Sequence, residues 1–428
     1  MDATTFQRLQ LSHWRQFGDV DITFHPRLTV LTGTNGAGKT TLLNILSQHF
    51  GWTNQLLSTP VRTRQGQISY LTGAETFVPL VSGSPIGDYQ QIGTLHYTTG
   101  SRSELMVPRV GHLQYNVQIY NQTQVAGLNI PSHRAIAQYQ VVPHIPTSGI
   151  RPREAFTNYQ NEVRNRFGGQ MVLNSSPLHR MKEALIAMAT FGAGNRLVPG
   201  DRELLRTYIG FIRVLRRLLP PSLGFRKLEI RTPDVVLVTS TGEFLIDAVS
   251  GGIGALIDLG WQIHTFSRDQ EHFVALIDEP ENHLHPSMQK SLLSSLLRAF
   301  PKVQFIVSTH SPFIVTSVRE SNVYVLSYHA ANDEAFGLPK KYSVRVTKLD
   351  QVNKAASAND ILRDVLGVDS TIPLWASLEI KNIVSRYRGR KIDEEAFRSM
   401  QRDLHDAGLG RSLAQAIDDL IPDEGDPL

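Results

Sequence analysis

One glycine-rich stretch, residues 28–46 (LTVLTGTNGAGKTTLLNIL), constrains the fold of this chain more than any other feature. It matches the phosphate-loop pattern of Gly, four residues, Gly, Lys, Thr at every fixed position, with Gly33, Gly38, Lys39 and Thr40. An apolar strand at residues 28–31 leads into the loop, where glycines let backbone N–H groups turn inward around a polyphosphate. Helix-compatible residues follow and bring the positive end of a helix dipole to the phosphates. The stretch therefore predicts a strand, loop and helix that bind a nucleoside triphosphate.

Within this loop we expect Lys39 to add positive charge near the β and γ phosphates and the Thr40 hydroxyl to ligate Mg²⁺. The predicted nucleotide contacts are Gly33, Thr34, Asn35, Gly36, Ala37, Gly38, Lys39, Thr40 and Thr41.

Two later apolar runs end in residues suited to triphosphate hydrolysis. FVALI, residues 273–277, reads as a strand buried on both faces of a mostly parallel sheet and leads into Asp278 and Glu279. Asp278 suits the Mg²⁺ site, and Glu279 suits a general base for the attacking water. VQFIVSTHS, residues 303–311, repeats this form and contains His310. A lone histidine usually only satisfies hydrogen bonds, but this position, one strand beyond the acidic pair, favours a catalytic γ-phosphate sensor.

The composition is that of an ordinary soluble globular protein, with 428 residues, 41% hydrophobic and 19% charged. No apolar run approaches the roughly 18 residues of a membrane span, and the N-terminus lacks a signal-peptide layout. We therefore expect a cytoplasmic protein with no membrane partner. The absence of cysteine excludes disulfides, iron–sulfur clusters and cysteine-ligated zinc.

The order of apolar patterns predicts an α/β fold with a mostly parallel core sheet, an antiparallel β-lobe, a helical insertion and a C-terminal helical tail. A hairpin at residues 6–24 precedes the loop strand. Alternating patterns predict further strands at residues 67–73, 75–83, 89–100, 104–111, 113–120, 225–231, 234–240, 242–247, 322–328 and 341–349.

Four regions follow from these patterns. Residues 1–150 hold the first part of the nucleotide-binding fold and the β-lobe, ending in a proline-punctuated connector at residues 129–154. Residues 151–222 form the helical insertion, and residues 223–350 the second part of the nucleotide-binding fold. Residues 351–428 are expected to be helical as far as 421, with breaks at Gly367, Pro373, Gly389 and Gly408 and a frayed acidic end.

Residues 202–219 predict an amphipathic helix with an arginine face formed by Arg202, Arg206, Arg213 and Arg217. Between residues 202 and 231 there are eight basic residues against two acidic ones. A solvated helix face is one interpretation, and a patch for nucleic acid or an acidic partner is the other. No aromatic residues are interleaved for base stacking, so the pattern is not specific for nucleic acid.

The motifs GTNGAGKT, SGG, LIDEPENHLHP and STHS, in this order after the hairpin, resemble the ATP-binding-cassette (ABC) ATPases. The similarity is to the soluble branch that contains the recombination protein RecF, the SMC proteins and the overcoming-lysogenization-defect (OLD) ATPases, and it covers most of residues 6–328. EPENHLHP is especially similar to the OLD-like group, and residues 130–134 (IPSHR) resemble a motif of OLD-like and Septu-type defence ATPases. The resemblance implies an ABC-ATPase fold with ATP and Mg²⁺ as cofactors.

The resemblance also implies a composite site. Ser250, Gly251 and Gly252 match the signature loop, which in this family reaches the γ-phosphate of a second subunit, so that two ATPs lie in a head-to-tail dimer. Ile253 departs from the Gln or Glu usual at its position, and we expect weaker activation across the dimer. Residues 281–285 match the loop that crosses the interface. A rival interpretation of His283 and His285 as metal ligands lacks further ligands in the sequence.

Two smaller expectations remain open. Arg15 matches a basic residue that touches phosphate in related ATPases, while a surface turn explains it equally well. The glutamine that couples ATP to the helical insertion is expected just before it, and Gln138 and Gln140 are both candidates.

The function that the resemblance implies is that of an ATPase in a bacterial anti-phage defence complex, in which the ATP state controls a partner effector such as a nuclease. The Asp-x-Asp pair of the OLD nuclease domain does not occur after His310, and the pair Asp19 and Asp21 is better explained by a β-turn. The alternative is a RecF- or SMC-like DNA repair or maintenance ATPase, with DNA contacted through the helix from Arg202 to Arg217. A transporter subunit fits poorly because of the β-lobe and helical insertion.

Overall fold

The computed structural model describes residues 3–62, 66–73, 89–109, 113–134, 139–167, 175–330, 334–335, 338–339, 342–368, 372–387 and 394–410. The chain forms two compact units, Met1–Ala358 and Asn359–Leu428. The predicted strand at residues 75–83 lies outside the described residues, as do the predicted break at Gly389 and the acidic end.

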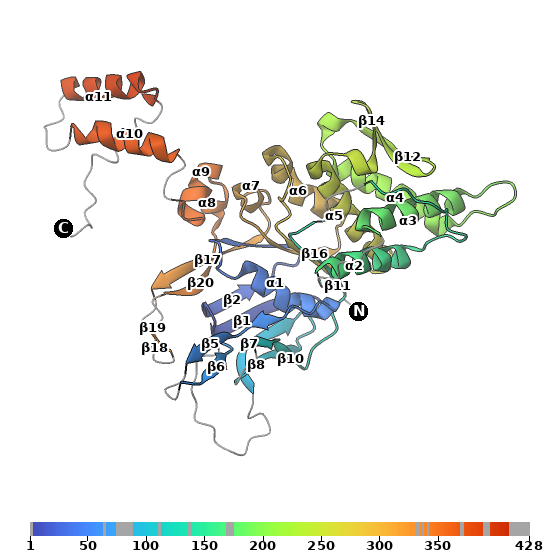
Figure 1. Cartoon of the computed structure of the whole chain (residues 1–428), viewed down its shortest axis with the longest axis horizontal. Coiled ribbons are helices and arrows are strands. Elements are labelled where there is room, and N and C mark those ends of the chain that lie inside the picture. The colour runs from blue at the N-terminus through green and yellow to red at the C-terminus, as the bar shows by residue number, and fades with distance from the viewer. Residues whose placement is uncertain are drawn as a thin grey trace, which may run out of the picture. The chain divides into compact units, whose positions relative to one another are not determined.

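Among the described residues, one sheet of eleven strands organises the first unit (Figure 1). Its parallel half consists of neighbouring strands that run from β17 to the edge strand β11. In spatial order these strands are β17 (Asn322–Ala330), β3 (Leu28–Gly33), β16 (Val303–Ser308), β15 (Phe273–Asp278) and β11 (Gly127–Ile130). Every residue of β3, β15 and β16 is buried, which explains why apolar residues predominate in their sequences.

The other half of the sheet is the β-lobe, in which neighbouring strands pair antiparallel. In spatial order its strands are β10 (Gln118–Tyr120), β8 (Arg102–Pro108), β7 (Tyr89–Tyr97), β1 (Phe6–Trp14) and β2 (Phe17–Thr23). Strand β20 (Tyr342–Lys348) lies between the halves, antiparallel to β17, and meets β2 through one residue pair, Phe17 with Val344. The ladder between the two halves is therefore narrow at this junction.

Short strand pairs border the sheet. They are β4 (Leu56–Leu57) with β9 (Gln114–Tyr115), β5 (Thr59–Arg62) with β6 (Ile68–Leu71), and β18 (Glu334–Ala335) with β19 (Leu338–Pro339).

Helix α1 (Lys39–Ser47) follows the phosphate loop and packs against β3, β15 and β16. The helical insertion contains α2 (Pro152–Phe167), α3 (Pro177–Ala193) and α4 (Arg202–Leu218), as the sequence predicts. Helix α5 (Gly251–Ser267) packs against α2, α4 and β11, so the insertion and the helix after the expected signature loop form one helical layer (Figure 1). A separate three-stranded sheet lies between α4 and α5 in the chain: β12 (Phe225–Arg231), β13 (Asp234–Thr239) and β14 (Glu243–Leu245).

After β15 come α6 (Pro286–Ala299), the short α7 (Pro312–Val315) and α8 (Gln351–Lys354). In the second unit, after α9 (Ala358–Asp360), helices α10 (Leu374–Ser385) and α11 (Glu394–Asp406) pack on each other around Ile380 and Leu404. Gly367 and Gly408 have positive φ and Pro373 precedes α10, in agreement with three of the predicted breaks. No helix in the described part of the chain is long and apolar enough to cross a membrane.

The prediction of an α/β fold with a mostly parallel core and an antiparallel lobe is confirmed. One assignment was wrong: Asn129 and Ile130 belong to strand β11 and not to an irregular connector. Only four residues long and bounded by Gly127 and Pro131, β11 has too few positions to display a periodicity, and its pairing with β15 stabilises it.

Candidate active site

Two glycines fix the shape of the phosphate loop. Gly33 has φ 132°, and a Cβ there would lie 2.0 Å from the carbonyl oxygen of Leu326. Gly38 has φ 98°, and a Cβ there would lie 2.3 Å from the ring of Phe17. Both the left-handed backbone and the close neighbours exclude side chains, so these positions require glycine. The loop ends at Gly38, directly before α1, as the motif predicts.

Lys39 is buried, with 6% of its surface exposed. Its Nζ donates to the carbonyl oxygens of Gly33 and Thr34, both at 3.0 Å. Burial lowers the pKa of Lys39 to about 8, although Glu279 and Asp278 act in the opposite direction. The ammonium group thus lies inside the loop, where the described residues bind it through carbonyl groups that a stronger anionic acceptor can replace.

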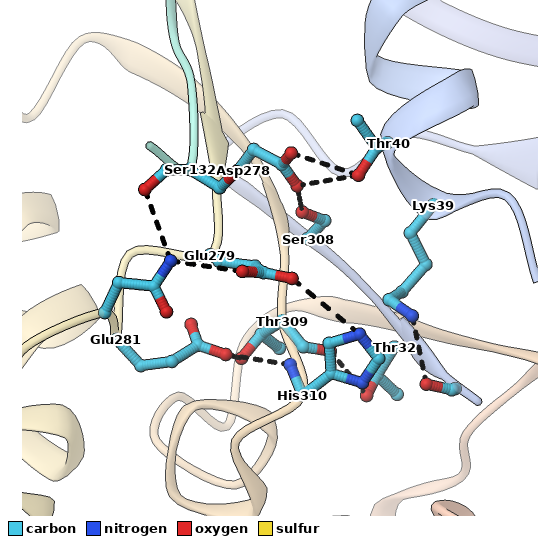
Figure 2. A network of polar contacts seen from close by, with 12 residues as sticks. Thr32, Lys39, Thr40, Ser132, Asp278, Glu279, Glu281, Ser308, Thr309 and His310 are labelled. Atoms are coloured by element: carbon cyan, nitrogen blue, oxygen red, sulfur yellow. Dashed lines mark hydrogen bonds and ion pairs between the residues drawn. The ribbon is translucent and has the colours of Figure 1, made fainter. Parts of the chain in front are cut away.

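Thr40 and Asp278 meet at the end of β15. The Thr40 hydroxyl donates to Asp278 Oδ2 at 3.0 Å, and Ser308 donates to the other carboxylate oxygen (Figure 2). Burial raises the pKa of Asp278. A hydroxyl beside a carboxylate at the mouth of a phosphate loop is the hard oxygen donor set that Mg²⁺ prefers, so these residues fit that ion. Ser308 was not predicted, because a serine at a strand end has no distinctive pattern.

Glu279 adopts a left-handed backbone conformation, with φ 46°. Its N–H donates to the Ser308 carbonyl oxygen at 3.0 Å, and its Oε2 accepts from Asn282 Nδ2 at 3.1 Å. Its Oε1 lies 3.8 Å from His310 Nε2. A non-glycine residue at positive φ is unusual and concentrates at functional sites, where surrounding contacts offset the strain.

The loop that carries His310 is bound to Glu281. One carboxylate oxygen, Oε1, accepts from the Thr309 hydroxyl at 2.6 Å and from the backbone N–H groups of His310 and Ser311 at 2.8 and 3.2 Å. Burial raises the pKa of Glu281 and lowers that of His310, so the imidazole is neutral near pH 7. The sequence placed Glu281 in an interface loop but gave no sign that it holds the His310 loop.

Figure 2 shows Lys39 and Thr40, from the start of α1, near Asp278, Glu279 and His310, which lie at or just after the ends of the neighbouring parallel strands β15 and β16. The structure therefore brings together the residues predicted for phosphate, metal and water.

Arg15 lies in the β1–β2 turn, with φ 50°. Its N–H donates to the Gly73 carbonyl oxygen at 2.8 Å, and its guanidinium lies 6.0 Å from the centre of the Trp14 ring. The neighbouring Gln16 contacts the loop more directly, since its Nε2 lies 3.5 Å from the Gly36 carbonyl oxygen.

The expected signature residues lie elsewhere. Ser250 is exposed and precedes α5, and Gly251 and Gly252 form its first turn. A Cβ on Gly252 would lie 2.8 Å from the His283 carbonyl oxygen, so this turn packs on the segment after β15. Ile253 is buried, which accounts for an apolar residue at this position.

The remaining candidates have structural contacts. Gln140 accepts from the Ser176 N–H at 2.8 Å, next to the start of α3, while Gln138 lies outside the described residues. His285 caps α6 by accepting from the Ser287 N–H. The described residues contain no cluster of three or more side chains able to hold a metal ion by themselves.

The arginine face of α4 is confirmed as solvent-exposed, opposite a face buried at Leu204, Phe211 and Leu215. The two acidic residues of this region pair with basic residues outside that face, Glu203 with Arg151 and Glu229 with Lys227 and Arg231.

Two family models match the segments that build this site. Residues 8–67 match an AAA domain, and residues 241–316 match the "AAA domain, putative AbiEii toxin, Type IV TA system". Together with the fold and the converging side chains, these matches indicate an ATPase with AAA-type nucleotide-binding segments.

Relatives narrow this class. The chain is 23% identical over 415 residues to Septu protein PtuA of Bacillus thuringiensis, covering 92% of each protein. It is 20% identical over 380 residues to the Retron Vc95 probable ATPase of Vibrio cholerae serotype O1 biovar El Tor, covering 75% of this chain and 73% of that protein. The chain is therefore an ATPase related to the Septu and retron ATPases, as the motifs indicate.

Among solved structures, an SMC head bound to the C-winged helix domain of ScpA is 14% identical, with a TM-score of 0.44, over 81% of this chain and 97% of that one.

Proposed function

We propose that this protein is the ATP-binding and ATP-hydrolysing subunit of a bacterial anti-phage defence complex, and that its ATP state controls a partner nuclease. The arrangement of Lys39, at the start of α1, with Asp278, Glu279 and His310, at or just after the ends of parallel strands, carries the enzymatic part. The relation to the Septu protein PtuA over 92% of both chains supports the defence part.

In this proposal the loop binds ATP through its backbone N–H groups, and Lys39 Nζ exchanges the carbonyl oxygens of Gly33 and Thr34 for phosphate oxygens. Thr40 and Asp278 hold Mg²⁺, which when bound neutralises charge on the phosphates. The Asp278 carboxylate is fixed for this by Ser308.

Glu279 accepts the proton of the attacking water at a carboxylate oxygen, while Asn282 orients that carboxylate. His310 Nε2 lies 3.8 Å from the Glu279 carboxylate, so in this proposal the neutral imidazole would contact the same water or the γ-phosphate. Glu281 acts as a positioning residue, because it fixes the backbone of the His310 loop.

A second copy of the chain completes the site in our proposal. Ser250 is exposed at the N-terminus of α5, a 17-residue helix whose positive dipole end suits a phosphate. In its own chain this turn packs on His283, so the γ-phosphate it serves would belong to the partner copy of a head-to-tail dimer.

The test of the catalytic assignment is Glu279→Gln. We expect ATP binding to persist, steady-state turnover to fall by about 10²-fold or more, and an ATP-bound dimer to accumulate. Turnover is measured by phosphate release, and assembly by light scattering with and without ATP. Lys39→Ala is the matched control, which we expect to lose nucleotide binding and remain monomeric. Wild-type turnover in Glu279→Gln would show that the base is another residue.

The partner is tested by co-purification. The product of the reading frame next to this gene is co-expressed with the full chain, and we expect a nuclease that co-purifies and whose DNA cleavage changes on addition of ATP. A neighbouring replication or repair gene, with no nuclease, would refute the defence assignment.

The second candidate is a DNA repair or maintenance ATPase, favoured by the exposed arginines of α4. It requires DNA-stimulated turnover that weakens steeply with salt, because each phosphate contact releases counterions. Replacing Arg206 and Arg213 by Gln would then reduce both stimulation and salt slope. Turnover that is independent of DNA and salt would exclude this candidate.

A further inference from the structure

A cavity of about 650 Å³ lies in the first unit, between the helical insertion and the start of α5. Its walls come from α2, α3, α5 and the segment after β11, and apolar side chains such as Leu178, Met181 and Ile257 dominate the lining. This volume falls in the range of roughly 300–1,000 Å³ typical of small-molecule sites. Its described lining includes no residue of the phosphate loop, so the cavity is distinct from the candidate active site.

One buried cation lines this apolar space. The Arg134 side chain is 7% exposed, and none of its three guanidinium nitrogens has a hydrogen-bond partner among the described residues. The Asp258 carboxylate lies 3.9 Å from Arg134 Nε, beyond hydrogen-bond distance. Asp258 Oδ1 already accepts from the Tyr159 hydroxyl and from Gln262 Nε2. Buried donors without acceptors are costly, and a guanidinium group with several free N–H groups is suited to an anionic oxygen.

The other charged groups of the cavity are already engaged or lie at its edge. Asp247 is paired with the buried Lys182, with 2.8 Å between Oδ2 and Nζ. Arg166, His133 and His283 are exposed residues of the lining. Arg134 is thus the buried charge of this cavity whose hydrogen-bonding capacity is not used within the described part of the chain.

We propose that this cavity binds a small amphipathic anion, with an apolar body against α2, α3 and α5 and a single carboxylate, sulfonate or phosphate group on the N–H groups of Arg134. The apolar lining supplies most of the affinity through burial, and the one guanidinium group selects the charge. This ligand differs from a free nucleotide in having a large apolar body and a single anionic group. A nucleotide fits poorly, because its several phosphate charges would meet only one buried cation in the described lining of the cavity.

The location gives such a ligand a regulatory role. Ser250 and Gly251, which we propose complete the ATP site of a second copy, form part of the same cavity wall. Ligand binding in the cavity would therefore change the packing of Ser250 and Gly251, the residues of the proposed signature turn. This regulatory consequence rests on the proposed function, whereas the binding itself does not.

Binding is tested on the full chain with 8-anilinonaphthalene-1-sulfonate, an apolar dye that carries one sulfonate group and fluoresces when buried. We expect one saturable site, from which decanoate displaces the dye. Decyltrimethylammonium has the same chain and the opposite charge, and we expect it not to compete. Equal competition by the cation, or the absence of a saturable site, overturns the proposal.

Variants locate the dye. Arg134→Gln should weaken its affinity about tenfold or more, with Arg134→Lys intermediate. Arg153→Gln, which removes a charge 85% exposed on α2, is the matched control and should have no effect. Leu178→Trp takes up cavity volume from α3 while leaving the Arg134 side chain in place and should abolish binding, so the test survives if Arg134→Gln fails to fold. Unchanged affinity in a folded Arg134→Gln or Leu178→Trp chain refutes the assignment.

A last variant separates this proposal from the ATPase function. Lys39→Ala should lose ATP binding and keep the dye site. Loss of dye binding in that variant would place the dye in the phosphate loop and refute the cavity assignment. If the variant keeps the dye site but decanoate does not change the ATP turnover of the wild-type chain, only the regulatory role is refuted.

Discussion

Glu281 concentrates the support of the His310 loop in one carboxylate oxygen, which accepts from the Thr309 hydroxyl and two backbone N–H groups. A charged acceptor binds such donors about twice as strongly as a neutral one. The loop geometry at His310 thus depends on a residue that does not touch the reacting atoms.

For this reason Glu281→Gln should lower kcat by about 10–100-fold while leaving KM for ATP within about threefold, since small displacements of a catalytic group cost about this much. Phosphate-release kinetics measure both constants. Glu271→Gln, a carboxylate 71% exposed and paired with Lys302 at the surface, is the control that should behave as wild type. A rise in KM at constant kcat would instead mean that Glu281 acts in binding.

The low pKa of Lys39, about 8, predicts the pH dependence of ATP binding. Only the protonated ammonium attracts phosphate, and bound phosphate raises its pKa, so binding takes up a proton and the affinity falls as pH rises through 8. The fall approaches tenfold per pH unit above that value. Titration calorimetry at pH 7 and 9, in buffers of different ionisation enthalpy, measures both effects.

Lys39→Arg is the matched control, because arginine keeps its charge throughout this range. Any affinity it retains should not vary between pH 7 and 9. Equal wild-type dissociation constants at the two values would contradict a lowered Lys39 pKa.

Among the secondary-structure elements, a fully buried lysine on α3 forms ion pairs with the sheet β12–β14 and with the turn before Ser250. Lys182 Nζ lies 2.8 Å from Asp247 and 3.2 Å from Asp234, and donates to the Gln140 carbonyl oxygen at 2.7 Å. The helical insertion and the approach to the proposed signature loop therefore share one ionic centre.

Lys182→Met leaves the buried Asp247 without its counter-charge and should destabilise the first unit by about 3–5 kcal/mol. Urea unfolding followed by tryptophan fluorescence measures the change. The double variant Lys182→Met, Asp247→Asn removes both charges and should recover part of the loss; a double variant less stable than the single one would argue against an unpaired carboxylate as the cause.

The elements also show how far the sequence could predict the site. The phosphate loop was predictable because its determinants, Gly33 to Thr40, are contiguous and each glycine has a steric reason. Asp278 and His310 were predictable because Asp278 ends the apolar strand β15 and His310 comes two residues after the mostly apolar strand β16. Ser308 and the free guanidinium of Arg134 depend on neighbours far apart in sequence, so no local pattern indicates them.

At the scale of the whole molecule, composite sites predict complementation. Lys39→Ala and Ser250→Arg chains should each be inactive, because one lacks the phosphate loop and the other the proposed signature turn. In a mixed dimer, one site combines the intact phosphate loop of the Ser250→Arg chain with the intact signature turn of the Lys39→Ala chain. The other site combines the two defective parts and is inactive. An equimolar mixture should therefore regain about a quarter of wild-type turnover per chain at most.

The control for complementation is a mixture of Lys39→Ala with Glu279→Gln, whose defects lie on the same side of the site and should not be rescued. Turnover restored equally in both mixtures, or in neither, would contradict a head-to-tail arrangement of sites.

The single pairing of Phe17 with Val344 joins the two halves of the long sheet. The residues at this seam are also the floor of the phosphate loop: Phe17 packs under Gly38, and Gln16 reaches Gly36. A sheet bends most easily where the fewest residue pairs join neighbouring strands. A force on the β-lobe would therefore distort the phosphate loop first. A protein that bound the β-lobe and moved it relative to the parallel strands would change the shape of the phosphate loop. It could therefore raise or lower the affinity for ATP without contacting the nucleotide site.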